Sequence, residues 1–354
     1  MAIRLSKIFL GLPHMLKQII DQLLSAHALN IEQSKYLMNE IMQGKLDEIT
    51  LTCILIALKM KGESLTELSG FAEVMQQYST RVTIDNPSRL VDIVGTGGDS
   101  FHSFNISTAS SFVAAGAGVK IAKHGNRSAS GLFGSADVLE ACGINLNLSP
   151  IQVSDCIQQL GIGFMFAPNH HPAMKYVQKV RKKLGVRTIF NLLGPLTNPS
   201  YAKRQIIGVY DKKWLQPFAA TLKQLGSIHS LIVHSKEGMD ELSCFESNYI
   251  VELKNNEIFS YELDPHTYQL AATSVDDIKV SSLKEAVNKL LDVLAGKHSA
   301  ARNIVVLNAG AAIYAAGLAD TIKEGIEAAI ESIDSHAAMT KLTDLKKLSN
   351  NHAK

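Results

Sequence analysis

The chain reads Val91-Asp92-Ile93-Val94-Gly95-Thr96-Gly97-Gly98-Asp99 at the point where an apolar run passes into a glycine-rich turn. The apolar run predicts a buried strand. Glycine lets the backbone turn sharply and present its N–H groups to an anion. The turn after this strand is therefore a candidate phosphate cradle.

Two polar motifs follow this turn. Asn105-Ile106-Ser107-Thr108 opens an apolar, alanine-rich stretch, and Lys123-His124-Gly125-Asn126-Arg127 ends the next apolar run. The first motif predicts a helix N-terminus, where the helix dipole favours negative charge. All three motifs fall at junctions between strands and helices. They therefore share the carboxyl edge of one sheet, where open α/β folds bind ligands.

Each motif also has an ordinary interpretation. The turn lacks the glycine spacing of dinucleotide sites and the Gly-Lys-Ser/Thr ending of a P-loop. The tetrapeptide 105–108 could simply cap a helix, and Lys123 and Arg127 could be surface charges. Three such motifs in one short segment favour an anion site over three unrelated features.

Composition limits the possible partners. The 354 residues are 46% hydrophobic, and 35 basic against 33 acidic residues give a net charge of +2. No polybasic arm is present, so we expect neither a nucleic-acid nor a membrane partner. The apolar core around Ile8 is too short for a signal peptide, and four scattered cysteines suit reduced thiols. These features predict a cytoplasmic protein.

The uncharged stretch 303–319 is rich in Ala and Gly and predicts a buried helix rather than a membrane span.

The order of predicted elements indicates two domains. The first eighty residues have helical periodicity, with a capping box at Asn30 and Gln33. After a break at 85–88, strands (119–122, 205–210 and 228–234) alternate with helices that begin near Gly134, Trp214 and Ser282. This alternation predicts an α/β fold with a mostly parallel sheet flanked by helices, plus a smaller all-helical domain. The helical stretch 171–196 interrupts the alternation. We therefore expect a helical domain of residues 1–87 plus about 168–200, and an α/β domain of residues 88–167 plus 201–354.

An adjacent acidic pair, Asp240-Glu241, follows the strand that ends at His234. Both side chains can reach one site only from a loop, which Gly238 allows. Two carboxylates suit Mg²⁺ bound together with water and substrate phosphates. The alternative is a solvated acidic pair.

Two further groups are less specific. His170-His171-Pro172 lacks the spacing of a metal site, so ligand contact or helix capping is the better interpretation. Arg181 stands beside Lys182 and Lys183 in what could be a solvated face. If one of the three turns inward, the planar guanidinium of Arg181 is the best holder of a carboxylate.

In order along the chain, these motifs resemble those of the anthranilate phosphoribosyltransferase family, which has a nucleoside phosphorylase-like fold. The matching segments are 92–108, 123–127, 134–140, 164–199, 238–243 and 315–317. The resemblance implies transfer of a phosphoribosyl group from phosphoribosyl pyrophosphate to the amino group of anthranilate. It also implies two Mg²⁺ ions per subunit and a homodimer joined through the helical domain.

The resemblance further implies roles for individual residues. The phosphoribosyl pyrophosphate site would comprise Gly95, Gly97, Gly98, Asp99, Asn105, Thr108, Lys123 and Ser135. The metal ligands would be Ser107, Asp240 and Glu241. The anthranilate path would comprise Gly95, His124, Asn126, His171, Arg181 and Gly194. No side chain is assigned as a catalytic acid, base or nucleophile, because the site acts by positioning and by charge stabilisation.

The chain departs from the family pattern at two places. Ser100 stands where the family often has Gly, and Gly131-Leu132-Phe133 replaces a polar run. Leu132 and Phe133 could close over the donor, or could accompany an altered substrate.

Two alternative functions remain open at this point. A pyrimidine nucleoside phosphorylase has a stretch similar to 137–140, but it needs no paired metals. A non-catalytic relative that binds nucleic acid is the other, and the near-neutral charge argues against it.

Overall fold

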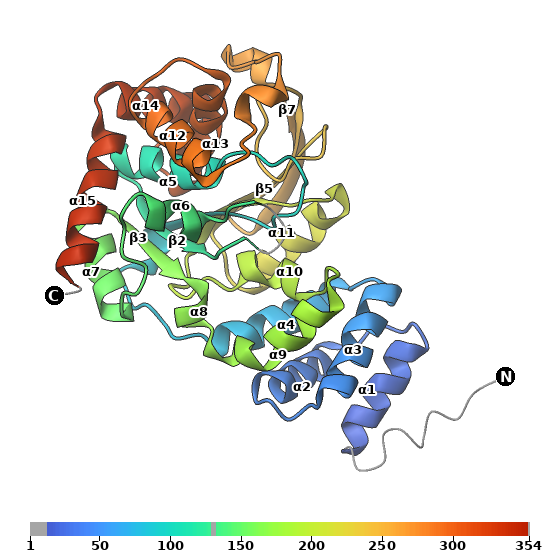
Figure 1. Ribbon diagram of the computed structural model, residues 1–354. Helices are drawn as coiled ribbons and strands as arrows, with labels where there is room; N and C mark the ends of the chain where they lie inside the picture. The colour runs from blue at the N-terminus through green and yellow to red at the C-terminus, as the bar shows by residue number, and fades with distance from the viewer. Residues whose placement is uncertain (1–12, 129–131, 353–354) are drawn as a thin grey trace. The chain divides into compact units, whose positions relative to one another are not determined.

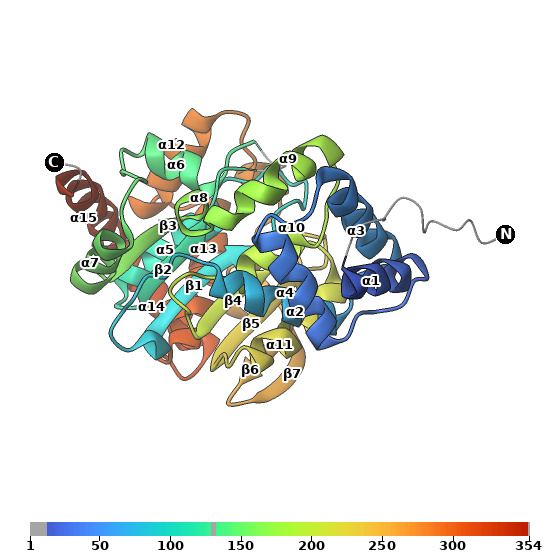
Figure 2. The same ribbon diagram turned by 90° about the horizontal axis from the view of Figure 1, so that it is seen from below.

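The computed structural model describes residues 13–128 and 132–352 and divides into two compact units (Figures 1 and 2). The helical unit comprises Met1–Ser79 and Pro172–Thr197, and the α/β unit comprises Thr80–His171 and Asn198–Lys354. Gly131, one of the residues that depart from the family pattern, lies outside the described residues.

The helical unit is a bundle built from two separate stretches of chain. Its elements are α1 (His14–Leu24), α2 (Ile31–Met42), α3 (Glu48–Lys61), α4 (Leu65–Gln77), η3 (Pro172–Met174), α9 (Lys175–Leu184), α10 (Phe190–Leu193) and η4 (Gly194–Leu196). The predicted capping box is confirmed, since Asn30 and Gln33 exchange hydrogen bonds at the start of α2. A second box at Ser64 and Glu67 opens α4. Helix α2 packs against α4, and α1 and α9 pack against α3.

The α/β unit is built on a sheet of seven strands in the order β3-β2-β1-β4-β5-β6-β7. The strands are β1 (Leu90–Gly95), β2 (Lys120–Gly125), β3 (Ile162–Phe166), β4 (Arg204–Gly208), β5 (His229–Ser235), β6 (Asn248–Lys254) and β7 (Glu257–Leu263). Neighbours from β3 to β5 are parallel, whereas β6 and β7 form an antiparallel hairpin at one edge. The prediction of a mostly parallel sheet is confirmed. The predicted strands omitted β3 and the hairpin.

Helices cover the sheet of the α/β unit. They are α5 (Ile106–Gly116), α6 (Ser135–Ala141), α7 (Pro150–Leu160), α8 (Ala167–His170), α11 (Leu215–Gln224), α12 (Leu283–Leu294), α13 (Ala300–Ala316), α14 (Ile322–Asp334) and α15 (Ala337–Asn351). Short 3-10 turns are η2 (Pro87–Arg89), η5 (Lys212–Trp214), η6 (Pro265–Tyr268) and η7 (Val275–Ile278). Helices α5 and α13 pack directly on the central strands, and α14 and α15 form an outer layer (Figure 1).

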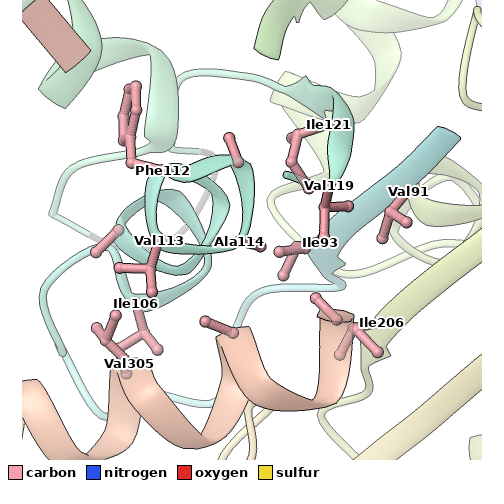
Figure 3. Close-up of a cluster of buried hydrophobic side chains, with 14 of the residues drawn as sticks. Val91, Ile93, Ile106, Phe112, Val113, Ala114, Val119, Ile121, Ile206 and Val305 are labelled. Carbon is pink, nitrogen blue, oxygen red and sulfur yellow. The ribbon is translucent and has the colours of Figure 1, made fainter. Parts of the chain in front are cut away.

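The core of this unit lies between the sheet and helices α5 and α13. Figure 3 shows Ile106 and Val113 of α5 near Val305 of α13, while Ile93 and Ile206 of the sheet lie farther along the same cluster. The uncharged stretch near residue 303 is α13, which confirms the predicted buried helix. Of the helices in the described residues, none has the length and apolarity to cross a membrane.

The first helical stretch of the helical unit ends at Ser79, and residues 80–171 and 198–354 form the α/β unit. Within the α/β unit, the backbone N–H of Thr80 donates to the His170 carbonyl (2.7 Å), and that of Val82 donates to the Pro199 carbonyl (3.1 Å).

Candidate functional site

The acidic pair lies on the segment 236–247, here called the acid loop, which joins β5 to β6. Gly238 has a φ of +102°, which a glycine adopts without strain. The expectation that Asp240 and Glu241 project from a loop is confirmed.

The glycine-rich turn and the acid loop meet at the carboxyl ends of β1 and β4. The Gly97 N–H donates to Asp240 Oδ2 (2.6 Å), and the Asp240 N–H donates to Asp99 Oδ2 (3.4 Å). In the structure the partner of the Gly97 N–H is thus a carboxyl group of the chain itself. The strand order reverses between β1 and β4, and this reversal is where open α/β sheets bind ligands.

Two glycines make room for Asp240. A Cβ on Gly208 would lie 1.5 Å from the Asp240 carbonyl oxygen, and a Cβ on Gly95 would lie 2.5 Å from Asp240 Oδ2. Both distances are far below van der Waals contact. Glycine at the last residues of β1 and β4 is therefore a condition for the position of Asp240.

The electrostatics of the acidic pair fit a cation. Burial and the nearby Asp99 raise the pKa of Asp240 to about 7, and burial together with Asp240 raises the pKa of Glu241 well above its ordinary value. Crowded carboxylates of this kind are stabilised by a divalent ion. Within the described residues, no three His, Cys, Asp or Glu side chains form a cage that could hold a metal by themselves. The donor set thus suits Mg²⁺, which keeps water and substrate oxygens as its other ligands.

The N-terminus of α5 adjoins this pair. The Ser107 backbone favours the charged form of Glu241 and so opposes the rise of its pKa, and the Lys123 ammonium donates to Ser107 Oγ (3.1 Å) and to the Ile93 carbonyl (2.6 Å). Thr108 Oγ1 is buried and finds no hydrogen-bond partner among the described residues. Such an orphaned hydroxyl at a helix N-terminus suits a ligand oxygen.

Three residues of these motifs have different surroundings. Asn105 occupies the N-cap position of α5, but its side chain makes no capping bond and donates to the Phe133 carbonyl (3.2 Å). Lys123 is buried rather than a surface charge. Arg127, in contrast, is half-exposed and pairs with Asp137 and Glu140 of α6, both at 2.8 Å.

Further predicted residues lie at the ends of β2 and of α8. The backbone N–H of His124 donates to Asp92 Oδ1 (3.2 Å), and the His124 ring lies 5.0 Å from the His171 ring, centroid to centroid. Both histidines are buried. Asn126 is exposed, and its carbonyl accepts from Ser135 Oγ (3.4 Å). The end of β2 therefore lies beside His171, which follows β3 and α8, and the loop after β2 brings Asn126 to Ser135 at the start of α6.

Comparison with known proteins decides the family. A family model described as "Glycosyl transferase family, a/b domain" matches residues 87–339, and the helical bundle domain of the same family matches residues 17–79. Anthranilate phosphoribosyltransferase from Methylobacillus flagellatus is 48% identical over 94% of this chain and 97% of its own. The enzyme of that name from Hydrogenovibrio crunogenus is 47% identical over 92% and 96%. The chain belongs to the anthranilate phosphoribosyltransferase family.

Solved structures of this family have the same fold. Anthranilate phosphoribosyltransferase from Thermus thermophilus superposes with a TM-score of 0.88 at 37% identity, covering 94% of this chain and 99% of that one. The Saccharomyces cerevisiae enzyme, solved in complex with PRPP and Mg, gives a TM-score of 0.87 at 26% identity and covers 96% and 100%. The fold class and the resemblance expected from the sequence are confirmed.

Within the helical unit, one of the three adjacent cations of the family motif is turned inward. Arg181 is half-buried, whereas Lys182 and Lys183 are exposed. Burial lowers the pKa of Arg181, and its guanidinium carbon lies 5.6 Å from the Phe190 ring centroid. A Cβ on Gly194 would meet no heavy atom of the described residues within 4 Å. Of the three cations, Arg181 is thus the least exposed.

The two departures from the family pattern have visible structural consequences. Ser100 adopts a φ of +66°, a conformation that favours glycine. Phe133 packs against the core of the α/β unit, whereas Leu132 is 48% exposed.

One buried pair was missed by sequence reasoning. Asn198 Nδ2 donates to Asp92 Oδ2 (2.7 Å) and to the Ala122 carbonyl (2.9 Å), and burial raises the pKa of Asp92 to about 6. The charged Asp92 in the middle of an apolar run is the signal that could have found it, since a buried carboxylate needs partners.

Proposed function

We propose that this chain transfers the 5-phosphoribosyl group of phosphoribosyl pyrophosphate to the amino group of anthranilate. The products are N-(5-phosphoribosyl)anthranilate and pyrophosphate, a step of tryptophan biosynthesis. The observation that carries the proposal is the junction of Gly97, Asp240, Glu241 and Ser107 at the carboxyl edge of the sheet. The relatives support the substrates, because the Saccharomyces cerevisiae enzyme has been solved with PRPP and Mg and with 4-fluoroanthranilate.

The donor and its metal bind at this junction. We assign the metal ligands to Ser107, Asp240 and Glu241, with two Mg²⁺ ions per subunit. Bound Mg²⁺ supplies positive charge to the departing diphosphate. The donor contacts are Gly95, Gly97, Gly98, Asp99, Asn105, Thr108, Lys123 and Ser135. Among these, the N-terminus of α5 and the Lys123 ammonium are the chain's own stabilisers of negative charge.

Anthranilate is assigned to polar groups in each unit. In the α/β unit these are Gly95, His124, Asn126 and His171. In the helical unit they are Gly194 and Arg181, whose inward guanidinium suits a carboxylate.

The reaction is a substitution at ribose C1. The bond from C1 to the diphosphate oxygen breaks as the bond from C1 to the anthranilate nitrogen forms, and a proton leaves that nitrogen. The chain holds the two reactants in line and offsets the charge on the leaving group. Such a site needs no nucleophilic side chain.

We also propose that the protein is a homodimer joined through the helical unit. Helix α3 buries one apolar face inside the bundle, while Ile49, Cys53, Ile56 and Met60 form a second stripe at i, i+4, i+7 and i+11. Ile49 is 68% exposed and Met60 82% exposed. Apolar stripes of this kind mark association surfaces.

The free cysteines suit a reducing cytoplasm.

One assay tests the activity. The purified protein is mixed with Mg²⁺, phosphoribosyl pyrophosphate and anthranilate, and the loss of anthranilate fluorescence is followed. We expect a loss that requires all three additions. Unchanged fluorescence, or phosphorolysis of thymidine in its place, would reject the proposal.

The role of the acidic pair is tested by mutation. Asp240→Asn with Glu241→Gln removes both charges, so we expect turnover at saturating Mg²⁺ to fall on the order of 100-fold or more. The matched control is Asp276→Asn with Asp277→Asn, an exposed acidic pair of η7, which should keep normal turnover. Near-normal activity of the first variant would contradict the assigned role.

A further inference from the structure

Asn308 of helix α13 holds the residue that follows the acidic pair. Its Oδ1 accepts from the Leu242 N–H (3.0 Å), and its Nδ2 donates to the Leu242 carbonyl (2.7 Å) and to the Ile304 carbonyl (2.8 Å). The side chain is completely buried. One amide therefore satisfies both backbone groups of Leu242.

This contact replaces the pairing that a strand would supply. The acid loop lies between β5 and β6, where its backbone has left the sheet. Buried N–H and C=O groups without partners are costly, so they must be bonded elsewhere. Asn248 does the same for the next residue, accepting from the Ser243 N–H (2.7 Å) and donating to the Ser243 carbonyl (2.9 Å). Two buried amides thus fix the chain directly after Glu241.

The upstream side of the pair is also fixed. The Met239 N–H donates to Ser235 Oγ (2.8 Å), and the Ser235 N–H donates to the Met239 carbonyl (3.1 Å). Ser235 belongs to β5 and Asn248 to β6, so these contacts come from the sheet. Asn308 alone among these three partners comes from a helix.

Helix α13 is a rigid support for this contact. Arg204 Nη1 of β4 donates to the Ala315 carbonyl (2.6 Å), and the Tyr314 hydroxyl donates to Glu252 Oε1 of β6 (2.8 Å). The helix is therefore bonded to the sheet near its C-terminal end and to the acid loop near its middle. Sites held by such elements keep their geometry.

We propose that Asn308 is a positioning residue for the acidic pair: it fixes the backbone of the acid loop so that Asp240 and Glu241 are arranged for a divalent cation before the cation arrives. This inference rests on the proposed function, because the cation is the one that accompanies the phosphoribosyl donor. Outer partners that orient metal ligands typically change metal affinity 10–100-fold when they are removed.

The test compares Asn308→Ala and Asn308→Asp with the wild type. Asn308→Asp keeps the side-chain volume and the acceptor for the Leu242 N–H but loses the donor. The matched control is Asn303→Ala, on the same helix, whose Nδ2 donates to the Leu270 carbonyl (3.3 Å), a group outside the acid loop. Binding of Mn²⁺ in the presence of phosphoribosyl pyrophosphate is measured by the electron paramagnetic resonance of the free ion. Melting temperatures establish that each variant is folded.

We expect the dissociation constant for Mn²⁺ to rise about 10–100-fold in the Asn308 variants and to stay at the wild-type value in Asn303→Ala. In turnover, the KM for phosphoribosyl pyrophosphate should rise while the KM for anthranilate stays constant, a split that a general loss of stability would not produce. If Asn308→Ala does not fold, Asn308→Asp decides.

Wild-type Mn²⁺ affinity in a folded Asn308 variant would overturn this inference and leave the proposed function intact. A wild-type protein that takes up no Mn²⁺ with the donor present would instead overturn the proposed metal site, and this inference with it.

Discussion

At the residue scale, the position of Asp240 depends on two neighbouring glycines that have no Cβ. Gly208 and Gly95 have no Cβ, and a Cβ on either would overlap the backbone or carboxylate of Asp240. The Gly97 N–H then donates to this carboxylate across 143 residues of chain. Two glycines thus leave room for Asp240 because they lack a Cβ, and a third glycine donates a hydrogen bond to its side chain.

Ser100 carries a conformational cost that a single substitution can remove. Its φ of +66° is unfavourable for a residue with a Cβ. We expect Ser100→Gly to raise the free energy of unfolding by about 0.5–1 kcal/mol, measured by urea denaturation. Ser103→Gly, nearby but outside the left-handed region, is the control and should lower stability. A destabilised Ser100→Gly protein would contradict the prediction.

His170 makes stability depend on pH. Burial lowers the pKa of His170, whose Nδ1 lies 3.0 Å from the Thr80 carbonyl oxygen. The unfolded chain takes up a proton near pH 6.5, whereas folded His170 resists it. The contribution of His170 to the free energy of unfolding is therefore complete above about pH 6.5. It is lost as the pH falls from there toward the lower pKa of the folded state.

The pH dependence assigned to His170 is checked by measuring melting temperatures between pH 8 and pH 5.5. His170→Gln should flatten the decline on the acid side, whereas His266→Gln, which replaces an exposed histidine, should keep the wild-type profile. An identical decline in all three proteins would assign the pH dependence to other groups.

At the element scale, helix ends and helix faces were predictable to different degrees. Capping residues mark where α2 and α4 begin, because a side chain bonds to a backbone N–H only three residues away. Helix α3 shows the opposite case. It is apolar on two faces, so its sequence alone does not say which face enters the bundle.

The capping box of α2 makes a measurable contribution to the free energy of unfolding. Asn30 Oδ1 accepts from the Gln33 N–H (2.8 Å). Asn30→Ala removes this acceptor, so we expect a loss of about 1 kcal/mol in the free energy of unfolding of the helical unit. The control is Asn39→Ala within the same helix, where alanine has the better helix propensity and stability should not fall. Equal losses in both variants would rule out a capping effect.

At the scale of the whole molecule, strand order creates the site. Strands β2 and β3 extend the sheet from one side of β1, and β4 to β7 extend it from the other. The loops after β1 and β4 therefore diverge at the reversal point, and the acid loop after β5 reaches it. The antiparallel hairpin of β6 and β7 completes one edge of the sheet without adding a residue to the proposed ligand contacts.

The proposed homodimer makes a prediction at this scale. Ile49→Asp with Met60→Asp places two charges on the exposed stripe of α3, so the mass measured by light scattering should fall from that of a dimer to that of a monomer at micromolar concentration. Ile151→Asp alters an equally exposed apolar side chain in the α/β unit, 75% exposed, and should leave the mass unchanged. A wild-type protein with the mass of one chain would reject the dimer.

The sequence by itself determined the features that depend on neighbours along the chain: the alternation of strands and helices, the glycine turn after β1, the N-terminus of α5 and the loop carrying Asp240. Tertiary structure alone decided which of these features meet. It assigned the Gly97 N–H to Asp240, directed Arg127 toward α6, and brought Asn308 to Leu242. Periodicity and capping act over a few residues and leave a local pattern. Contacts between distant segments depend on strand order and on the absence of a Cβ at the crossing points, and neither leaves such a pattern.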